Sequence, residues 1–228
     1  MSKIYLTVTA HPDDEVLGFG ASAYVLSKQG HTIINCILSG NVDARMNRPE
    51  VEELNKHANN AQEIIGAQPP IFGDFPNIKF NTVPHLEMVQ FIEKIIAGVQ
   101  PDYIFTHHPS DLNDDHLCTS RACLAASRLF QRRSDIKPVS GVYFMEILSS
   151  TDWAFPSNVL PFQPNTFIEV GKEGVDKKIE ALNAYEGVMR PFPHSRSNET
   201  LSGLAALRGS QSGKNYAEAF QAAFQILN

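Results

Sequence analysis

Short apolar runs alternate with amphipathic stretches over the first two thirds of the chain. The runs are rich in β-branched and aromatic residues, as expected of strands that are buried on both faces of a sheet. We predict strands at residues 4–10, 32–38, 71–75, 103–106 and 139–147. Between them, apolar residues recur every three or four positions, which predicts helices at residues 15–29, 50–65, 86–99 and 116–131. This alternation predicts an α/β fold with a Rossmann-like, three-layer architecture and a mostly parallel sheet.

The last third of the chain has a less regular pattern. Several prolines predict a loop over residues 152–165, and a strand is expected at residues 166–170. An apolar stripe from Val175 to Tyr185 predicts a helix. We predict that two short helices, near residues 199–208 and 215–227, follow it.

The length and composition fit one globular domain. The chain has 228 residues, of which 43% are hydrophobic, and this is enough for one substantial core. No repeat, low-complexity segment or linker interrupts the sequence, so we expect a single domain over residues 1–228. We expect residues 1–150 to form the Rossmann-like core and residues 151–228 to complete the site with loops and helices.

The charge and cysteine content argue against several classes of protein. A formal net charge of -6 argues against general nucleic-acid binding, which needs a basic surface. No apolar run approaches the roughly 18 residues that cross a bilayer, and residues 1–10 lack the features of a signal peptide. The three cysteines lack CxxC spacing, which is typical of reduced thiols. We therefore expect a cytoplasmic protein with no nucleic-acid partner and no membrane span.

Two polar clusters follow predicted strands. The first, at residues 11–15, has the sequence His-Pro-Asp-Asp-Glu and comes directly after the first strand. The second, at residues 107–116, follows the fourth strand and contains three histidines and three aspartates. In a Rossmann-like order the first and fourth strands are neighbours, and ligands bind at their carboxyl ends. We therefore expect the two clusters to meet at one site.

The residue types in these clusters suit a metal ion. His11 and Asp14 are three residues apart at a helix start, so both can face one ion, and His116 would complete the set. A catalytic zinc site uses three such ligands and keeps a fourth position open. Asp13 would then be able to take a proton from water, which predicts metal-assisted hydrolysis. Because histidine and carboxylate accept several divalent ions, Fe²⁺ in place of Zn²⁺ stays open.

A plainer interpretation of the clusters is helix capping. Pro12 followed by three acidic residues also suits a helix N-terminus, and Glu15 is expected to cap the helix or to orient its neighbours. Residues 111–114 could similarly serve as loop and capping residues. In that case the protein would be a non-catalytic nucleotide- or sugar-binding Rossmann module. Gly18 and Gly20 do not form a dinucleotide fingerprint, and we expect them to allow the helix to pack closely on the sheet.

Three segments resemble one known family. Ala10 to Glu15, with the following Val-Leu-Gly-Phe-Gly-Ala, resembles the signature of the PIG-L/LmbE family of N-acetylglucosaminyl deacetylases. The second cluster resembles that family's second motif, and residues 208–220 resemble its carboxyl end. The resemblance implies an LmbE-like Rossmann fold, zinc, and hydrolysis of an acetamide on an amino sugar. It implies zinc ligands and a general base at the same positions as the spacing, namely His11, Asp14 and His116 for zinc and Asp13 for the base.

One position departs from the family pattern. Many family members carry a histidine three residues before the last zinc ligand, paired with an aspartate. Here the two positions are Asn113 and Asp115, which we keep as catalytic candidates beside Asp13. Asparagine can donate a hydrogen bond to an oxyanion, but it cannot carry a proton near neutral pH. We therefore predict that Asp13 both takes the proton and returns it to the leaving amine. The other candidates for the acid are His107, His108 and His194.

The candidate substrate contacts are arginines and a loop histidine. Arg45 and Arg48 follow the second strand, at the edge where substrate should bind, and His194 lies in a proline-rich loop. Arginine can bind phosphate or carboxylate through two hydrogen bonds, which favours an anionic substrate. Each of the three residues is also explained as an ordinary solvated side chain. The same two interpretations apply to Arg190, Arg196 and Arg208.

The predicted function is hydrolysis. We expect a zinc-dependent enzyme that removes the N-acetyl group from a small amino sugar or its conjugate. A zinc amidohydrolase that acts on a non-sugar amide is an alternative, because substrate choice depends on loops that the pattern does not place. The resemblance also leaves open a homo-oligomer, since relatives form rings or dimers.

Overall fold

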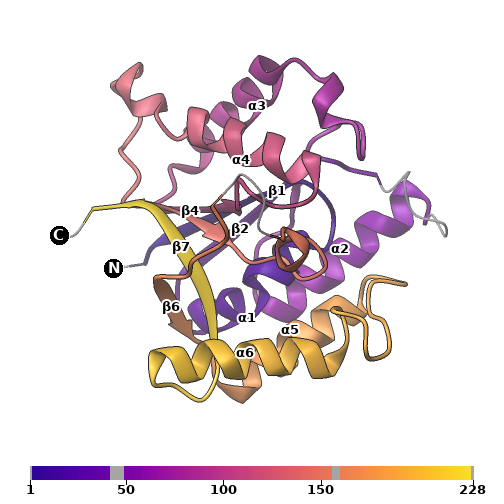
Figure 1. The fold of residues 1–228 in the computed structure, drawn as a ribbon. Coiled ribbons are helices and arrows are strands. Elements are labelled where there is room, and N and C mark those ends of the chain that lie inside the picture. The colour runs from indigo at the N-terminus through magenta and orange to yellow at the C-terminus, as the bar shows by residue number, and fades with distance from the viewer. Residues whose placement is uncertain (1, 42–48, 156–159, 227–228) are drawn as a thin grey trace.

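A seven-stranded sheet lies at the centre of the computed structural model, which describes residues 2–41, 49–155 and 160–226 (Figure 1). The strand order across these residues is β3-β2-β1-β4-β5-β7-β6. Neighbours from β3 to β5 are parallel, whereas β7 is antiparallel to both β5 and β6. The strands are β1 (Ile4–Thr9), β2 (Thr32–Ile37), β3 (Ile71–Phe72), β4 (Tyr103–His107), β5 (Gly141–Met145), β6 (Thr166–Glu169) and β7 (Ala217–Gln225). The mostly parallel α/β sheet expected from the sequence is confirmed.

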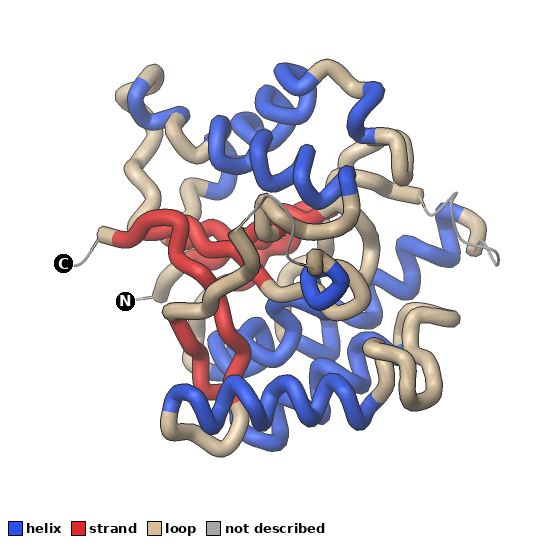
Figure 2. Tube along the Cα trace, in the orientation of Figure 1, coloured by secondary structure: helices blue, strands red, loops and turns tan. Residues whose placement is uncertain are grey.

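Helices cover both faces of the sheet and give the three layers (Figure 2). One face packs against α1 (Asp14–Lys28), α2 (Val51–Ile65), α5 (Gly171–Asn183) and α6 (Asn198–Ser212). The other packs against α3 (His85–Val99) and α4 (Asp114–Ala126). Three short 3₁₀ helices lie in the connections: η1 (Phe80–Thr82), η2 (Leu129–Gln131) and η3 (Thr151–Trp153).

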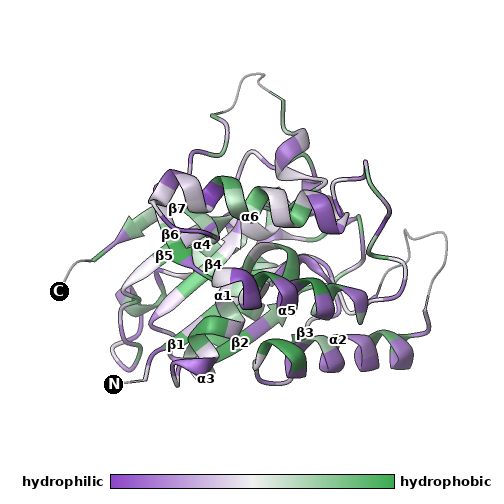
Figure 3. Ribbon diagram, turned by 90° about the horizontal axis from the view of Figure 1, so that it is seen from below, coloured by the Kyte–Doolittle hydropathy of each residue, from purple (hydrophilic) through white to green (hydrophobic). Residues whose placement is uncertain are grey.

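Successive side chains of each strand point to opposite faces of the sheet and pack into the two cores in turn. In β4, Ile104 packs into the core on the α3–α4 face, while the next residue, Phe105, packs into the core on the α1 face. In β5, Val142 and Tyr143 divide in the same way. Strands of this kind need apolar residues at successive positions, which is why they are near-continuous apolar runs in the sequence. Along α2 and α5, hydrophilic and hydrophobic residues alternate, as expected for one buried and one solvated side, whereas α1 is buried over most of its surface (Figure 3).

Two glycines let α1 pack closely. A Cβ atom on Gly18 would lie 2.6 Å from Ile147 Cδ1, so the helix could not lie as near to the end of β5 with any larger residue. A Cβ atom on Gly20 would lie 3.3 Å from Lys178 Cγ, so this glycine faces α5 rather than the sheet. The expected close packing on the sheet therefore holds for Gly18. None of the helices within the described residues has the length and hydrophobicity that a membrane crossing requires.

The predicted helix at residues 215–227 is wrong. Residues 217–225 form β7, which is inserted between β5 and β6. The alanines and glutamines of this segment favour a helix only weakly, by fractions of about 1 kcal/mol per residue, and tertiary context overrides such a preference. Here β7 pairs with a strand on each side, and Phe220 is fully buried against Phe19 and Phe105. The preceding helix, α6, is longer than predicted and begins after Ser197, whose side chain accepts a hydrogen bond from Thr200 N.

Candidate metal centre and active site

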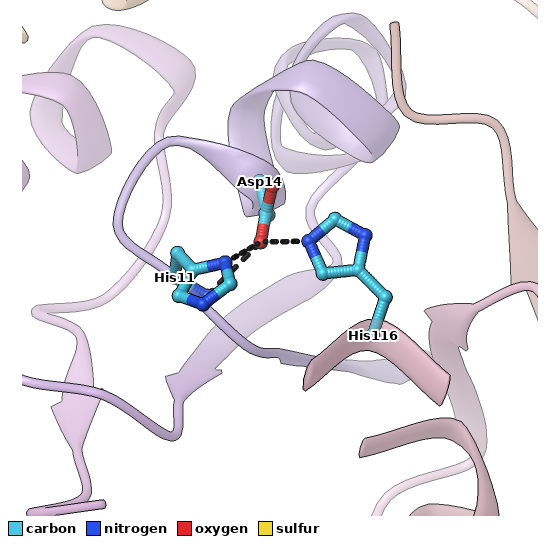
Figure 4. A group of neighbouring side chains, drawn as sticks. All are labelled: His11, Asp14 and His116. Carbon is cyan, nitrogen blue, oxygen red and sulfur yellow. Dashed lines mark hydrogen bonds and ion pairs between the residues drawn. The ribbon is translucent and has the colours of Figure 1, made fainter. Parts of the chain in front are cut away.

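The two polar clusters meet at the carboxyl ends of β1 and β4, which are neighbours in the sheet. His11 and Asp14 come from the turn into α1, and His116 comes from the first turn of α4. Figure 4 shows the Asp14 carboxylate between the two imidazoles. One ligand atom from each of the three residues lies within 4.8 Å of the others. Asp14 Oδ2 is 3.1 Å from His116 Nε2 and 3.4 Å from His11 Nδ1.

This trio fits a divalent metal ion. All three residues are at least nine-tenths buried, and the enclosed His116 Nε2 has the ion pair with Asp14 but no hydrogen bond of good geometry. A buried imidazole nitrogen in this position is well suited to complete its coordination with an ion. Two nitrogens and one oxygen converging on one point are a donor set that zinc or iron accepts, with room for a further ligand.

In the absence of an ion, the trio holds protons that a metal ion would replace. Burial alone would lower the pKa of His116, but the carboxylates of Asp14 and Asp111 raise it to about 10. Burial alone would raise the pKa of Asp14, but the imidazoles of His116 and His11 hold it well below its usual range. Without an ion, protons on the imidazoles therefore balance the carboxylate, and a metal ion would have to displace them.

Each imidazole of the trio is held by a carboxylate on its other nitrogen. His11 Nε2 is 2.9 Å from Asp115 Oδ2, and the second oxygen of Asp115 accepts a hydrogen bond from Phe80 N at 2.9 Å. His116 Nδ1 is 3.1 Å from Asp111 Oδ2. Such a carboxylate fixes the orientation and tautomer of a metal-binding histidine. Asp115, which the sequence places among the catalytic candidates, therefore contacts His11 from behind.

Asp111 is a residue whose role the sequence did not identify. Its carboxylate accepts hydrogen bonds from the Ser150 hydroxyl and, at 2.9 Å, from the Thr151 hydroxyl, in addition to its contact with His116. Ser150 and Thr151 lie after β5, so the segment after β5 supports His116, the candidate metal ligand from α4. The only available signal was the position of Asp111 inside the second cluster.

Asp13 lies beside the trio in a strained conformation. Its φ of 105° and ψ of -28° are left-handed, a region that residues other than glycine seldom adopt. Its side chain makes no capping hydrogen bond to α1 and is nearly buried. Instead, Asp13 Oδ2 accepts a hydrogen bond from Arg196 Nη1 at 3.0 Å. The capping interpretation of the first cluster therefore does not describe Asp13.

Glu15 orients this part of the chain. Its side chain is fully buried, and Oε2 accepts a hydrogen bond from Asp13 N at 3.0 Å. Its other oxygen accepts from the Tyr185 hydroxyl at 2.6 Å and from Gln62 Nε2 at 3.0 Å. Burial raises the pKa of Glu15 to about 7. Glu15 thus ties the strained backbone at Asp13 to α2 and to the segment after α5, which is the orienting role expected for it.

His107, the last residue of β4, and His108, which follows it, are both buried. His107 stacks on His116 with 3.7 Å between ring centroids, and its Nε2 accepts a hydrogen bond from Ala10 N at 2.9 Å. Burial lowers the pKa of His107 to about 3, so this ring is neutral near pH 7. His108 contacts the Ser110 hydroxyl at 2.7 Å and Gln221 at 3.1 Å. Both rings therefore serve the local structure.

A cleft of about 350 Å³ opens next to the trio. Its walls include Asn113 and Asp115 on one side and Ser149 and Ser150 on the other. Asn113 is the N-cap of α4, and its side-chain oxygen accepts a hydrogen bond from Asp115 N at 2.9 Å. The amide nitrogen of Asn113 is therefore the part of this side chain that remains for a substrate. The other lining residues among those described are Ile78, Asn81, Leu112 and Asp114.

The substrate-contact candidates have different positions. Arg45 and Arg48 lie outside the described residues. His194 is exposed, and its Nδ1 accepts a hydrogen bond from Arg196 N at 3.0 Å. Partial burial and the neighbouring Arg196 and Arg190 lower the pKa of His194. Arg208 is engaged with Glu146 through two hydrogen bonds, of 2.9 and 2.5 Å, so its guanidinium serves the structure.

Comparisons with known proteins give both a family and a set of folds. A family model described as GlcNAc-PI de-N-acetylase, PIG-L, matches residues 6–127. The uncharacterized deacetylase YaiS of Escherichia coli (strain K12) is 29% identical over 195 residues, which cover 81% of this chain and 91% of that protein.

Two solved structures are similar over nearly the whole chain. GalB, the 4-carboxy-2-hydroxymuconate hydratase from Pseudomonas putida KT2440, has a TM-score of 0.79 and 21% identity, covering 99% of this chain and 98% of its own. The N,N'-diacetylchitobiose deacetylase from Pyrococcus horikoshii has a TM-score of 0.75 and 19% identity, covering 97% of this chain and 84% of its own. At these identities the likeness concerns the fold, and the fold hosts more than one reaction.

Proposed function

The chain belongs to the PIG-L family, and from this premise we propose that it is a zinc-dependent deacetylase that removes the N-acetyl group from an amino sugar or its conjugate. The observation that carries the proposal is the buried trio of His11, Asp14 and His116 with a separate carboxylate, Asp13, beside it. The family match favours amide hydrolysis over the hydration that GalB performs on the same fold.

We assign metal binding to His11 Nδ1, Asp14 Oδ2 and His116 Nε2. When bound, a zinc ion supplies a nucleophile near neutral pH by lowering the pKa of water, and it polarises a carbonyl. Fe²⁺ would suit the same donors. Asp115 and Asp111 hold the two imidazoles in place for this task.

Asp13 moves the proton in this proposal. The oxygen of the attacking water bonds to the acetamide carbon, and Asp13 takes the proton that the water gives up. When the carbon–nitrogen bond breaks, the same proton passes from Asp13 to the leaving amine, and acetate and a free amino sugar result. Asn113 contributes a hydrogen bond from its amide nitrogen to the carbonyl oxygen as that oxygen gains negative charge.

The proposed substrate class is an N-acetylated amino sugar. The family model that matches residues 6–127, described as GlcNAc-PI de-N-acetylase, supports it. A negative charge on the substrate is a separate proposal. The described residues that line the cleft include no lysine or arginine. The proposed preference for an anionic substrate therefore depends on Arg45, Arg48 and the loop that carries His194.

The test uses zinc-loaded protein and a panel of acetamides. The panel contains N-acetylglucosamine, its 1-phosphate, a nucleotide-linked form, N,N'-diacetylchitobiose and a non-sugar acetamide, and both amine and acetate release are measured. We expect equal amounts of the two products from at least one sugar, and none after zinc is removed with a chelator.

Other outcomes separate the alternatives. Release from the non-sugar acetamide alone would favour a zinc amidohydrolase of another specificity. Sugar binding without zinc binding or turnover would favour the non-catalytic Rossmann module. Equal rates for neutral and phosphorylated sugars would contradict the anionic preference and leave the deacetylase proposal intact.

A further inference from the structure

The geometry points to Arg196 as the positioning residue for Asp13. The inference rests on the proposed function, in which Asp13 is the group that moves the proton. It assigns a role to the loop between α5 and α6, which lies in the last third of the chain and about 180 residues from the base. Arg196 acts through Asp13 in two ways: it fixes the direction of the carboxylate and balances its charge.

The contact has two fixed points. Arg196 Nη1 donates to Asp13 Oδ2 at 3.0 Å, and Arg196 Nε donates to the Ser149 hydroxyl at 2.9 Å. The Asp13 side chain is 3% exposed and that of Arg196 is 23% exposed, so the pair is largely shielded from solvent. Two hydrogen bonds from one planar guanidinium restrict its rotation, which a single ammonium contact would not.

The backbone of Arg196 is also held. Its N–H donates to His194 Nδ1 at 3.0 Å, and its carbonyl accepts from Arg190 N at 3.2 Å. The next residue, Ser197, is the N-cap of α6. The arginine therefore projects from a loop that is anchored to the start of a helix, and this is where the exposed His194 has its role in the structure.

The other fixed point of Arg196 belongs to the metal centre. Ser149 has a left-handed φ of 71°, and the next residue, Ser150, donates to the carboxylate of Asp111, which in turn contacts His116. The loop after β5 therefore contacts both the arginine and the carboxylate behind a metal ligand. A shift of Arg196 would be transmitted to the base, and a shift of this loop would be transmitted to both.

Arg196 also brings a positive charge to a site rich in carboxylates. Asp14 belongs to the trio, and four further buried carboxylates lie around it, namely those of Asp13, Glu15, Asp111 and Asp115. Within the described residues, Arg196 is the only lysine or arginine whose side chain forms an ion pair with any of them. The family histidine that could offer a positive charge is replaced here by the neutral Asn113. A buried carboxylate that loses a charged partner is destabilised in its ionised form and can turn towards other polar groups.

Glu15 and Arg196 restrain different parts of Asp13. Glu15 binds its backbone N–H and so supports the left-handed conformation. Arg196 binds its carboxylate and so sets the direction of the oxygen that must meet the water. Loss of Arg196 should therefore affect the chemical step more than substrate binding.

The test compares four zinc-loaded proteins on a sugar that the wild type deacetylates: the wild type, Arg196→Ala, Arg196→Lys and Arg190→Ala. Arg190 lies in the same loop, is exposed, and its side chain hydrogen-bonds only to Gly187 O among the described residues, so it is a matched control. We expect Arg196→Ala to lower kcat about 100-fold, the scale of a misplaced catalytic group, with KM changed by less than about threefold. The kcat of Arg196→Lys should lie between those of the wild type and Arg196→Ala, and the kcat of Arg190→Ala should stay within about twofold of the wild type.

A rescue measurement separates positioning from folding. Guanidinium chloride at about 20 mM should raise the kcat of Arg196→Ala at least fivefold, and it should not affect Asp13→Ala, because only the first variant leaves a gap of guanidinium shape beside a carboxylate. Zinc content should equal that of the wild type in all four proteins. A kcat for Arg196→Ala within threefold of the wild type, or a loss with no rescue and with loss of zinc, would overturn the inference.

The pair can also be measured without turnover. In denaturant unfolding, the effects of Arg196→Ala and Asp13→Asn should be coupled. The unfolding constant of the double variant should be at least fivefold smaller than the value expected if the two single changes acted independently. Coupling below twofold would contradict the contact itself. A wild type that deacetylates no sugar but shows this coupling would refute the proposed function and keep the Arg196–Asp13 pair.

Discussion

Asp14 and Glu15 are neighbours at the start of α1, and both are buried, yet their surroundings are opposite in kind. Asp14 faces two imidazoles, one from the turn before α1 and one from the first turn of α4, and the facing nitrogen of His116 forms an ion pair with it but no hydrogen bond of good geometry. Both oxygens of Glu15 accept hydrogen bonds, from Asp13 N, Tyr185 and Gln62. The pKa of Asp14 lies well below its usual range because of the imidazoles, whereas burial raises that of Glu15 to about 7.

The difference separates a ligand site from a structural network. A buried polar group is normally satisfied by the protein itself, as Glu15 is. On the Asp14 side, protons on the imidazoles balance the carboxylate in the protein alone, and an ion would take their place. Asp13 precedes both in the sequence: its backbone N–H belongs to the Glu15 network, and its carboxylate pairs with Arg196. Changes on the Asp14 side should therefore remove metal binding, and changes on the Glu15 side should remove stability.

The largest expected effect is on zinc affinity. His116→Ala removes one of three ligands and should weaken zinc binding at least about 1000-fold, since each ligand contributes a large share of the affinity. Competition with a chromophoric chelator measures this directly. His85→Ala is the matched control, because His85 is exposed at the start of α3, and its zinc affinity should equal that of the wild type. Equal affinities for the two variants would mean that the trio does not hold the ion.

The next effect is on stability and concerns the closed network. Glu15→Ala leaves Asp13 N, the Tyr185 hydroxyl and Gln62 Nε2 without their acceptor, and each buried unsatisfied group costs about 1–3 kcal/mol. We expect the free energy of unfolding of the zinc-free protein to fall by about 3 kcal/mol or more in urea titrations. Zinc affinity should change much less than in His116→Ala. If Glu15→Ala kept its stability but lost zinc, Glu15 would be part of the ligand site and the distinction between the two carboxylates would be wrong.

The smallest effect is the pH dependence of zinc binding. In the zinc-free protein Asp14 and Asp111 raise the pKa of His116 to about 10, so this imidazole carries a proton at pH 7. Zinc binds the neutral ring, so binding releases that proton and must strengthen as the pH rises. We expect affinity to increase about tenfold per pH unit between pH 6 and 8. Calorimetry in buffers of different ionisation enthalpy counts the protons released. An affinity independent of pH would show that His116 is already neutral.

Much of this arrangement follows from the sequence. The apolar runs predicted the parallel strands, and the Rossmann-like order brought His11, Asp14 and His116 together from positions about 100 residues apart. These inferences succeed because they depend on local pattern and on a general rule of strand order. The spacing also predicted a role for Asp13 apart from the ligands, and that role stays a prediction.

The remainder depends on tertiary contacts that leave no local pattern. The segment that forms β7 has helix-forming residues and is a strand because β5 and β6 are there to pair with it. From the sequence, the same two interpretations applied to Arg196 as to Arg190, and only the contacts of the folded chain distinguish the two residues. Asp111 was hidden in a cluster of similar residues until the loop after β5 reached it.

The most direct test of the central claim is to compare Asp13→Asn and Asp14→Asn side by side, measuring bound zinc and deacetylation for each. We expect Asp13→Asn to retain about one zinc ion per chain and to lose at least about 100-fold in kcat, as removal of a general base does. We expect Asp14→Asn to lose the zinc itself. Zinc retained in Asp14→Asn and lost in Asp13→Asn would contradict the account, because the base and the ligand would then have been exchanged.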